Sequence, residues 1–178
     1  MTIRTLLDDA AARRPNRVAV RYRRDAEWRS RTYSELAKGV GQMAEAFGRL
    51  GLRPGEEHVA VILENGPEWV ETYLAAAGTG LSVVPLDPKL RAEEVAYILR
   101  DSDAVAVVTD ARHRDLLEAV LPELPSVRAI VAVDGCEAVA RLADRPCYSY
   151  ESLRAEVGDG PFAWYAAHKP APQSVASV

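Results

Sequence analysis

The stretch from His58 to Pro88 constrains the fold more than any other part of the chain. The run from His58 to Leu63 is apolar and rich in Val and Ile, which is typical of a strand buried on both faces. Apolar side chains then recur at helical spacing, and residues 81–86 form a second apolar run. Two buried strands joined by a crossover helix are expected to be parallel. The pattern predicts an α/β protein.

The crossover helix has recognisable ends. Asn65 is predicted to be its N-cap, and Pro67 suits the first turn because the N–H groups there have no partner within the helix. Gly80 can adopt the positive φ that ends a helix. The spacing also predicts that Trp69 lies on the buried face beside Tyr73 and not in a ligand pocket.

The same alternation continues along the chain, so we expect a mostly parallel central sheet with helices on both faces. The later predicted elements are a helix over 92–101, a strand over 104–109, a helix from Asp110 to Pro122, a strand over 129–133, and short helical pieces around 137–142 and 150–157.

Three elements are predicted before this region. They are a helix capped by Thr2 that buries Ile3, Leu6, Leu7 and Ala10, a hairpin over 18–33 at a sheet edge, and a helix capped by Ser34 that buries Leu36, Val40, Met43, Phe47 and Leu50. Residues 39–44 of the last helix match the letters of the dinucleotide fingerprint G-x-G-x-x-A. That fingerprint requires glycines between a strand and a helix start, so close helix packing is the favoured interpretation.

Length, charge and the lengths of the apolar runs limit the classes of function that we expect. The chain has 178 residues, enough for one domain, and its 22 basic and 26 acidic residues are interspersed. No basic patch suggests nucleic-acid binding, and no apolar run approaches the ~20 residues of a membrane span. The start of the chain lacks the apolar segment of a signal peptide, so we expect a cytoplasmic protein.

No metal or disulfide framework is indicated. Cys136 and Cys147 are the only cysteines, and they lack the spacing of a zinc site or a redox motif. His58, His113 and His168 are scattered without ligand spacing. We therefore expect inert cysteines and no metal ligands.

The composition changes near Gly160. Residues 161–178 contain two prolines after Lys169 and no visible period, which predicts a loosely ordered tail after a domain of residues 1–160. The tail carries Phe162, Trp164 and Tyr165. Aromatic side chains that fold back onto the domain are favoured over an exposed interaction patch.

Several motifs, taken in order, resemble the AMP-forming adenylating enzymes, which include acyl-CoA synthetases, adenylation domains of peptide synthetases, and luciferases. The matching segments are R-T-Y-S-E-L over 31–36, L-E-N over 63–65, L-A-A-A-G-T-G over 74–80, V-P-L-D-P over 84–88 and E-V-A-Y-I-L-R-D-S over 94–102. The resemblance covers about Ile3 to Val157 and implies the N-terminal subdomain of such an enzyme. Arg91 departs from the Thr, Ser or Pro that relatives place before the last segment.

The resemblance implies a parent that activates a carboxylate as acyl-AMP with ATP and Mg²⁺ and then transfers it to a thiol of CoA or of a carrier protein. The family's phosphate loop, T-S-G-T-T-G-x-P-K-G, is absent from these 178 residues, as are its later motifs. We therefore expect a truncated, inactive chain and assign no catalytic, cofactor-binding or metal-binding residue.

Two other classes stay open. A non-catalytic interaction module could keep this fold, and a phosphate loop encoded in the DNA downstream would argue against it. A free-standing nucleotide-binding protein needs a phosphate loop at a strand end, for which residues 64–66 and 87–89 are poor candidates. We also expect a homodimer through an uncovered apolar surface near the tail.

Overall fold

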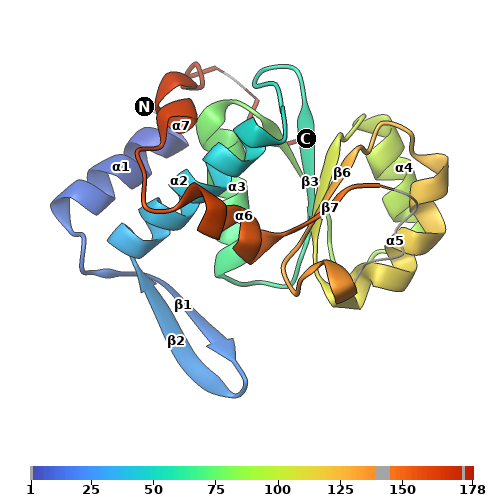
Figure 1. Cartoon of the computed structure of the whole chain (residues 1–178), viewed down its shortest axis with the longest axis horizontal. Helices are drawn as coiled ribbons and strands as arrows, with labels where there is room; N and C mark the ends of the chain where they lie inside the picture. Colours follow the sequence, from blue (N-terminus) through green and yellow to red (C-terminus); the bar gives the residue numbers. More distant parts are fainter. Residues whose placement is uncertain (1, 139–144, 174) are drawn as a thin grey trace.

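The computed structural model describes residues 2–138, 145–173 and 175–178 (Figure 1). Its centre is a five-stranded sheet in which every neighbouring pair is parallel. The strands, in spatial order, are β4 (Ser82–Pro85), β3 (His58–Ile62), β5 (Ala106–Thr109), β6 (Ala129–Ala132) and β7 (Cys147–Ser149). The predicted α/β class is confirmed. Strand β7 was not predicted because three residues give no readable alternation.

Helices cover both faces of the sheet, as Figure 1 shows. The strands divide their side chains accordingly: Val59 and Val61 join one apolar cluster, whereas Ala60 and Ile62 join the other. The helices on the first face are α2 (Tyr33–Arg49), α3 (Pro67–Thr79) and α6 (Tyr150–Val157), and those on the second are α4 (Ala92–Asp101) and α5 (Arg114–Val120).

Helix α3 differs from its prediction at its start and on its buried face. Its N-cap is Gly66, which makes no side-chain bond, so the prediction of Asn65 was wrong. It ends as expected at Gly80, where φ is 93°. Trp69 is only partly buried, because α3 lies between the sheet and α2 and turns small or polar side chains such as Ala75 and Ala76 inward. The large aromatic side chains of α3, Trp69 and Tyr73, are only partly buried.

Helix α2 begins at Tyr33, one residue before the predicted cap, Ser34. Its N-cap is Thr32, whose hydroxyl accepts from Glu35 N at 3.2 Å while the Glu35 carboxylate accepts from Thr32 N at 2.7 Å. The predicted apolar stripe is buried except for Leu50, which is partly exposed. A Cβ added at Gly39 would lie 2.5 Å from Glu71 Cδ, so this glycine serves close helix packing.

The hairpin is a separate two-stranded sheet that projects from the body of the molecule (Figure 1). It consists of β1 (Val18–Arg24) and β2 (Glu27–Thr32), which are antiparallel. The expected position at the edge of a larger sheet was wrong, because β1 and β2 form a sheet of their own in which most side chains are exposed. Trp28 near its tip is 70% exposed.

Helix α1 (Ile3–Arg13) is capped by Thr2 as predicted. Its buried residues are Arg4 and Leu7, whereas Leu6 is 52% exposed, contrary to the prediction. The short 3-10 helices are η1 (Ala111–His113), η2 (Leu121–Glu123) and η3 (Cys136–Ala138). The predicted helical piece around 137–142 lies mostly outside the described residues.

The described part of the tail packs against the domain. Residues Ala163–Ala167 form α7, and three aromatic side chains meet helical glycines that leave room for them. The pairs are Gly41 with Phe162, Gly48 with Trp164, and Gly78 with Tyr165. Further along, Val83 N donates to Ala176 O and Val178 N donates to Val83 O, both at 3.0 Å. The tail therefore also covers part of the exposed edge of β4.

Arg4 joins the first helix to this tail. Its side chain is buried, and Nη1 donates to the backbone oxygens of Tyr165 and of His168, the latter at 2.8 Å. The guanidinium carbon lies 3.7 Å from the centre of the Tyr165 ring. A charged group in this position offsets its desolvation through hydrogen bonds to carbonyl oxygens and contact with the ring.

We predict that Arg4→Ala lowers the free energy of unfolding by about 2 kcal/mol, because it removes these bonds and leaves carbonyl groups unpaired. Urea unfolding measures this loss, and limited proteolysis should show faster cleavage within 162–178. Arg13→Ala is the control, since that side chain on the same helix is 78% exposed. Equal stability of the two variants would contradict the proposed anchoring.

Candidate functional site

The order of the strands determines where a ligand site is expected. From β3 the chain passes through α3 to β4 on one side, and it then returns through α4 to β5 on the other side of β3. The connections that leave β3 and β5 therefore run in opposite directions. In open α/β sheets, ligands bind at such a switch point, outside the carboxyl ends of the strands.

A cleft of about 580 Å³ lies at this position. Its walls come from the loops that follow β3, β5 and β6, from the start of α3, and from the hairpin. The lining residues are Tyr22, Arg23, Arg24, Asp25, Leu63, Glu64, Asn65, Gly66, Pro67, Glu68, Asp110, Arg112, Val133, Asp134 and Glu151.

Acidic side chains outnumber basic ones in this lining, six to three. Glu68 is paired with Arg24 at 2.8 Å, and Asp110 contacts His113 Nδ1 at 2.7 Å. Asp134 accepts a hydrogen bond from Ala111 N at 3.0 Å. The excess of carboxylates and the lack of a glycine-rich turn among these lining residues disfavour a polyphosphate here. A neutral polar or cationic group suits the cleft better.

A second hollow of about 490 Å³ adjoins the first along the same edge, and the two share residues 63–65. Trp69 lines it together with Pro85 and Lys89, so this side chain is not confined to the buried face as predicted. The Trp69 ring stacks on Tyr73, with 5.3 Å between ring centres and 8° between planes. This pair gives the edge an apolar surface.

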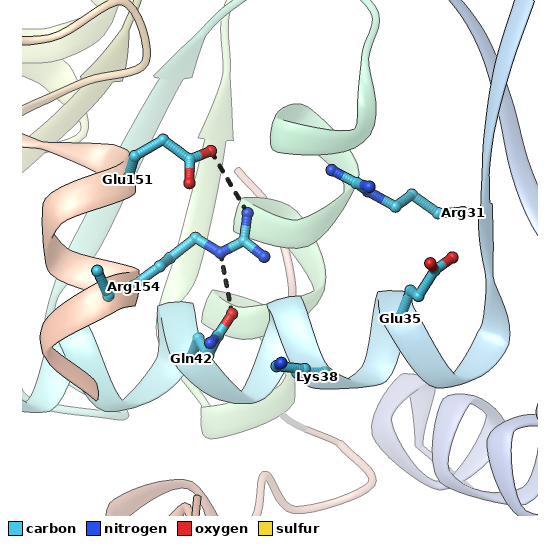
Figure 2. Close-up of a pocket in the computed structure, with 7 residues that line it drawn as sticks. Arg31, Glu35, Lys38, Gln42, Glu151 and Arg154 are labelled. Atoms are coloured by element: carbon cyan, nitrogen blue, oxygen red, sulfur yellow. Dashed lines mark hydrogen bonds and ion pairs between the residues drawn. The ribbon is translucent and has the colours of Figure 1, made fainter. Parts of the chain in front are cut away.

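A third hollow, of about 300 Å³, lies between α2, α6 and the hairpin (Figure 2). Figure 2 shows Arg154 pointing from α6 toward α2, where its Nε donates to Gln42 Oε1 at 3.1 Å. Gln42 Nε2 donates to Gly158 O at 2.8 Å. Arg31 and Glu35 line the opposite side. Because most of its charged groups already have partners, this hollow has little capacity to bind a free ion.

Arg154 also contacts a buried acid, Glu71, with 3.3 Å between Nη1 and Oε2. The Glu71 side chain is 1% exposed, and Tyr150 donates its hydroxyl to Oε2 at 2.9 Å. Among the described residues, Glu71 Oε1 has no hydrogen-bond partner. Burial raises the pKa of Glu71, although Arg154 and Tyr150 oppose this effect. Burial and then the Glu71 charge raise the pKa of Tyr150.

This buried group connects α2, α3 and α6. Glu71 does not line any of the three hollows described above, and its contacts with Tyr150 and Arg154 give it a role in helix packing. Sequence reasoning missed it, because a single glutamate in a helix usually lies on the solvent side. The only available signal was Gly39 in the middle of a helix, which leaves space for the carboxyl group.

The histidines and cysteines do not form a metal site within the part of the chain that the structure describes, where no three potential ligands gather. His113 is buried against Asp110, and the His168 ring lies tilted against Trp164 with 4.4 Å between ring centres. His58 begins β3. Among the described helices, none combines the length and the apolar character that crossing a bilayer requires.

Comparison with known proteins identifies the family. The family model described as AMP-binding enzyme matches residues 7–176, so the chain belongs to the AMP-binding enzyme family. A linear gramicidin synthase of Brevibacillus parabrevis is 33% identical over 138 residues, which are 78% of this chain and 2% of that protein. A crotonobetaine/carnitine–CoA ligase of Escherichia coli is 32% identical over 124 residues, which are 69% of this chain and 23% of the ligase.

Two solved structures have the same fold as this chain. The apo structure of Mycobacterium smegmatis MbtA matches 99% of this chain with a TM-score of 0.78 and 26% identity, and the match covers 30% of that chain. The anthranilate CoA ligase AuaEII, in complex with anthranoyl-AMP, matches 98% of this chain with a TM-score of 0.75 and 22% identity. The chain spans less than a third of the length of these proteins.

Glu71 leads to a prediction about pH. A carboxyl group whose pKa is raised on folding adds most stability below its unfolded value near 4.5, and this contribution is lost as the pH rises through the folded value. Glu71→Gln removes that dependence. We therefore expect the stability of the variant, relative to the natural chain, to improve as the pH rises from about 4 to about 8.

Urea unfolding at a series of pH values measures this difference. Glu118→Gln, at an exposed position on α5, is the control and should show no such trend. A relative stability of Glu71→Gln that falls with rising pH would show that the folded state favours the ionised carboxylate instead.

Proposed function

We propose that the chain is the N-terminal part of a cytoplasmic AMP-forming ligase that activates a carboxylic acid and passes it to a thiol. The observation that carries this proposal is the match of the AMP-binding family over residues 7–176, together with a fold like that of CoA ligases. In such a reaction, a carboxylate oxygen attacks the α-phosphorus of ATP and pyrophosphate leaves. A thiol of CoA or of a carrier protein then attacks the acyl carbonyl carbon, and AMP leaves.

Within this proposal the 178 residues provide scaffold and not catalysis. Adenylation requires groups that position the phosphates and neutralise their charge. The sequence contains no loop of the T-S-G-T-T-G type, and acidic side chains outnumber basic ones in the lining of the cleft at the carboxyl edge of the sheet. ATP, Mg²⁺ and the thiol acceptor would accordingly be held by other parts of a whole ligase.

The alternative is a non-catalytic interaction module that keeps the fold of the family. The docked tail favours it, since Phe162, Trp164 and Tyr165 fill the spaces left by glycines of α2 and α3. A domain that covers its own helices in this way can be stable by itself. The two proposals differ in whether a phosphate loop belongs to the same protein.

Both proposals predict that this chain alone neither binds ATP·Mg tightly nor forms acyl-adenylates. Calorimetry with ATP·Mg and pyrophosphate exchange with mixed fatty and aromatic acids test this, and a full-length family member serves as the positive control. We expect exchange at the level of a protein-free blank. Micromolar ATP affinity would reveal a site in these residues and contradict the proposed division of roles.

We further propose a homodimer formed through the apolar surface that remains at the β4 edge. This surface consists of the Trp69–Tyr73 stack, the exposed Pro85, and Val178, which is 62% exposed. The tail contributes its end and not its aromatic residues, which point inward. A closed contact of this kind covers apolar area with one self-complementary interface.

Light scattering tests the dimer over a range of concentrations. Val178→Glu should weaken association at least about tenfold by placing a charge in the contact, whereas Leu6→Glu, at an exposed position on α1, should not. A natural chain that stays a monodisperse monomer at high concentration, without binding an apolar dye, would refute the dimer.

A further inference from the structure

The fold brings together the only two cysteines of the chain. Cys136 begins the 3-10 helix η3, which packs against both β6 and β7. Cys147 is the first residue of β7, where it lies beside Ile130 of β6. The contact between η3 and β7 brings the two cysteines to the same edge of the sheet, and both are free and partly exposed. No pattern in the sequence indicated that they would meet.

We infer that Cys136 and Cys147 are a redox modification site, a reversible dithiol that a peroxide or an oxidised small-molecule disulfide converts into an intramolecular disulfide. The contact between η3 and β7 meets the main geometric requirement, because a disulfide needs the two backbones close together. Partial exposure gives the oxidant access. The inference does not depend on the proposed ligase function.

The chemical environment sets the order of events. Burial, together with the hydrogen bond to Cys136, raises the pKa of Cys147 to about 12, so its thiol stays protonated at neutral pH. Oxidation therefore begins at Cys136. Its thiolate attacks one oxygen of hydrogen peroxide, the O–O bond breaks, hydroxide leaves, and Cys136 becomes a sulfenic acid.

The second step closes the bond. The sulfur of Cys147 attacks the sulfur of Cys136, the S–O bond breaks, and the thiol proton leaves with the oxygen as water. In total the two thiols lose two electrons and two protons, and the peroxide is reduced to two water molecules. With oxidised glutathione, two successive exchanges release two molecules of reduced glutathione instead.

The disulfide would strengthen a weak edge of the sheet. In the part of the chain that the structure describes, β7 is a three-residue edge strand that pairs with β6 alone, and α6 begins directly after it at Tyr150. A bond between η3 and β7 would hold this strand in place whenever the pair is oxidised. Oxidation should thus raise thermal stability without changing the fold.

The test treats the full chain with hydrogen peroxide or oxidised glutathione. Intact mass should fall by two hydrogen atoms, and a non-reducing peptide map should show one peptide in which Cys136 is joined to Cys147. We expect the Tm to rise by about 5 °C, since the closed loop is short, and dithiothreitol to reverse both changes.

Cys136→Ser and Cys147→Ser are the matched controls, and each should instead gain oxygen or one glutathione on the remaining cysteine. Mapping on the natural chain keeps the test valid if a variant does not fold. Separate adducts on both cysteines of the natural chain, or only disulfides between molecules, would overturn the inference. A disulfide that leaves the Tm unchanged or lowers it would overturn the claim that the bond fits the native fold.

Discussion

The close approach of α2 to α3 is the contact on which the rest of the structure depends. Gly39 has no side chain at the crossing, and the Glu71 carboxyl group occupies the space that a Cβ would need. Tyr150 and Arg154 of α6 bond to the same carboxyl group. One glycine and one buried acid thereby hold together the three helices that cover one face of the sheet.

The opposite ends of the sheet are stabilised in different ways. Beyond the amino ends of the strands, Glu57 accepts hydrogen bonds from Arg128 at 2.8 and 2.9 Å, and it also pairs with Arg53. The Arg128 hydrogen bonds lower the pKa of Glu57 to about 2. At the carboxyl ends, acids and arginines line an open cleft. The amino end is therefore closed by a strong ion cluster, and the carboxyl end is left accessible.

The chain has the fold of the AMP-binding enzyme family, but acidic side chains outnumber basic ones in its main cleft. The family establishes the fold over residues 7–176, whereas the chemistry attributed to a whole ligase depends on groups that the cleft does not contain. The scaffold role proposed above would reconcile the two, because a parallel sheet with helices on both faces can position loops without supplying catalytic groups of its own. The docked tail is compatible with the same fold.

The sequence by itself determined the α/β class, most helix and strand positions, and the family, because apolar periodicity and caps such as Thr2 and Gly80 act over a few residues. Only the tertiary structure decided which side chains are buried and which residues meet. It left Trp69 only partly buried, buried Glu71, packed the tail against the domain, and placed η3, which contains Cys136, against β7, which contains Cys147. Those outcomes depend on how closely helices approach one another and how strands align, which local sequence patterns do not encode.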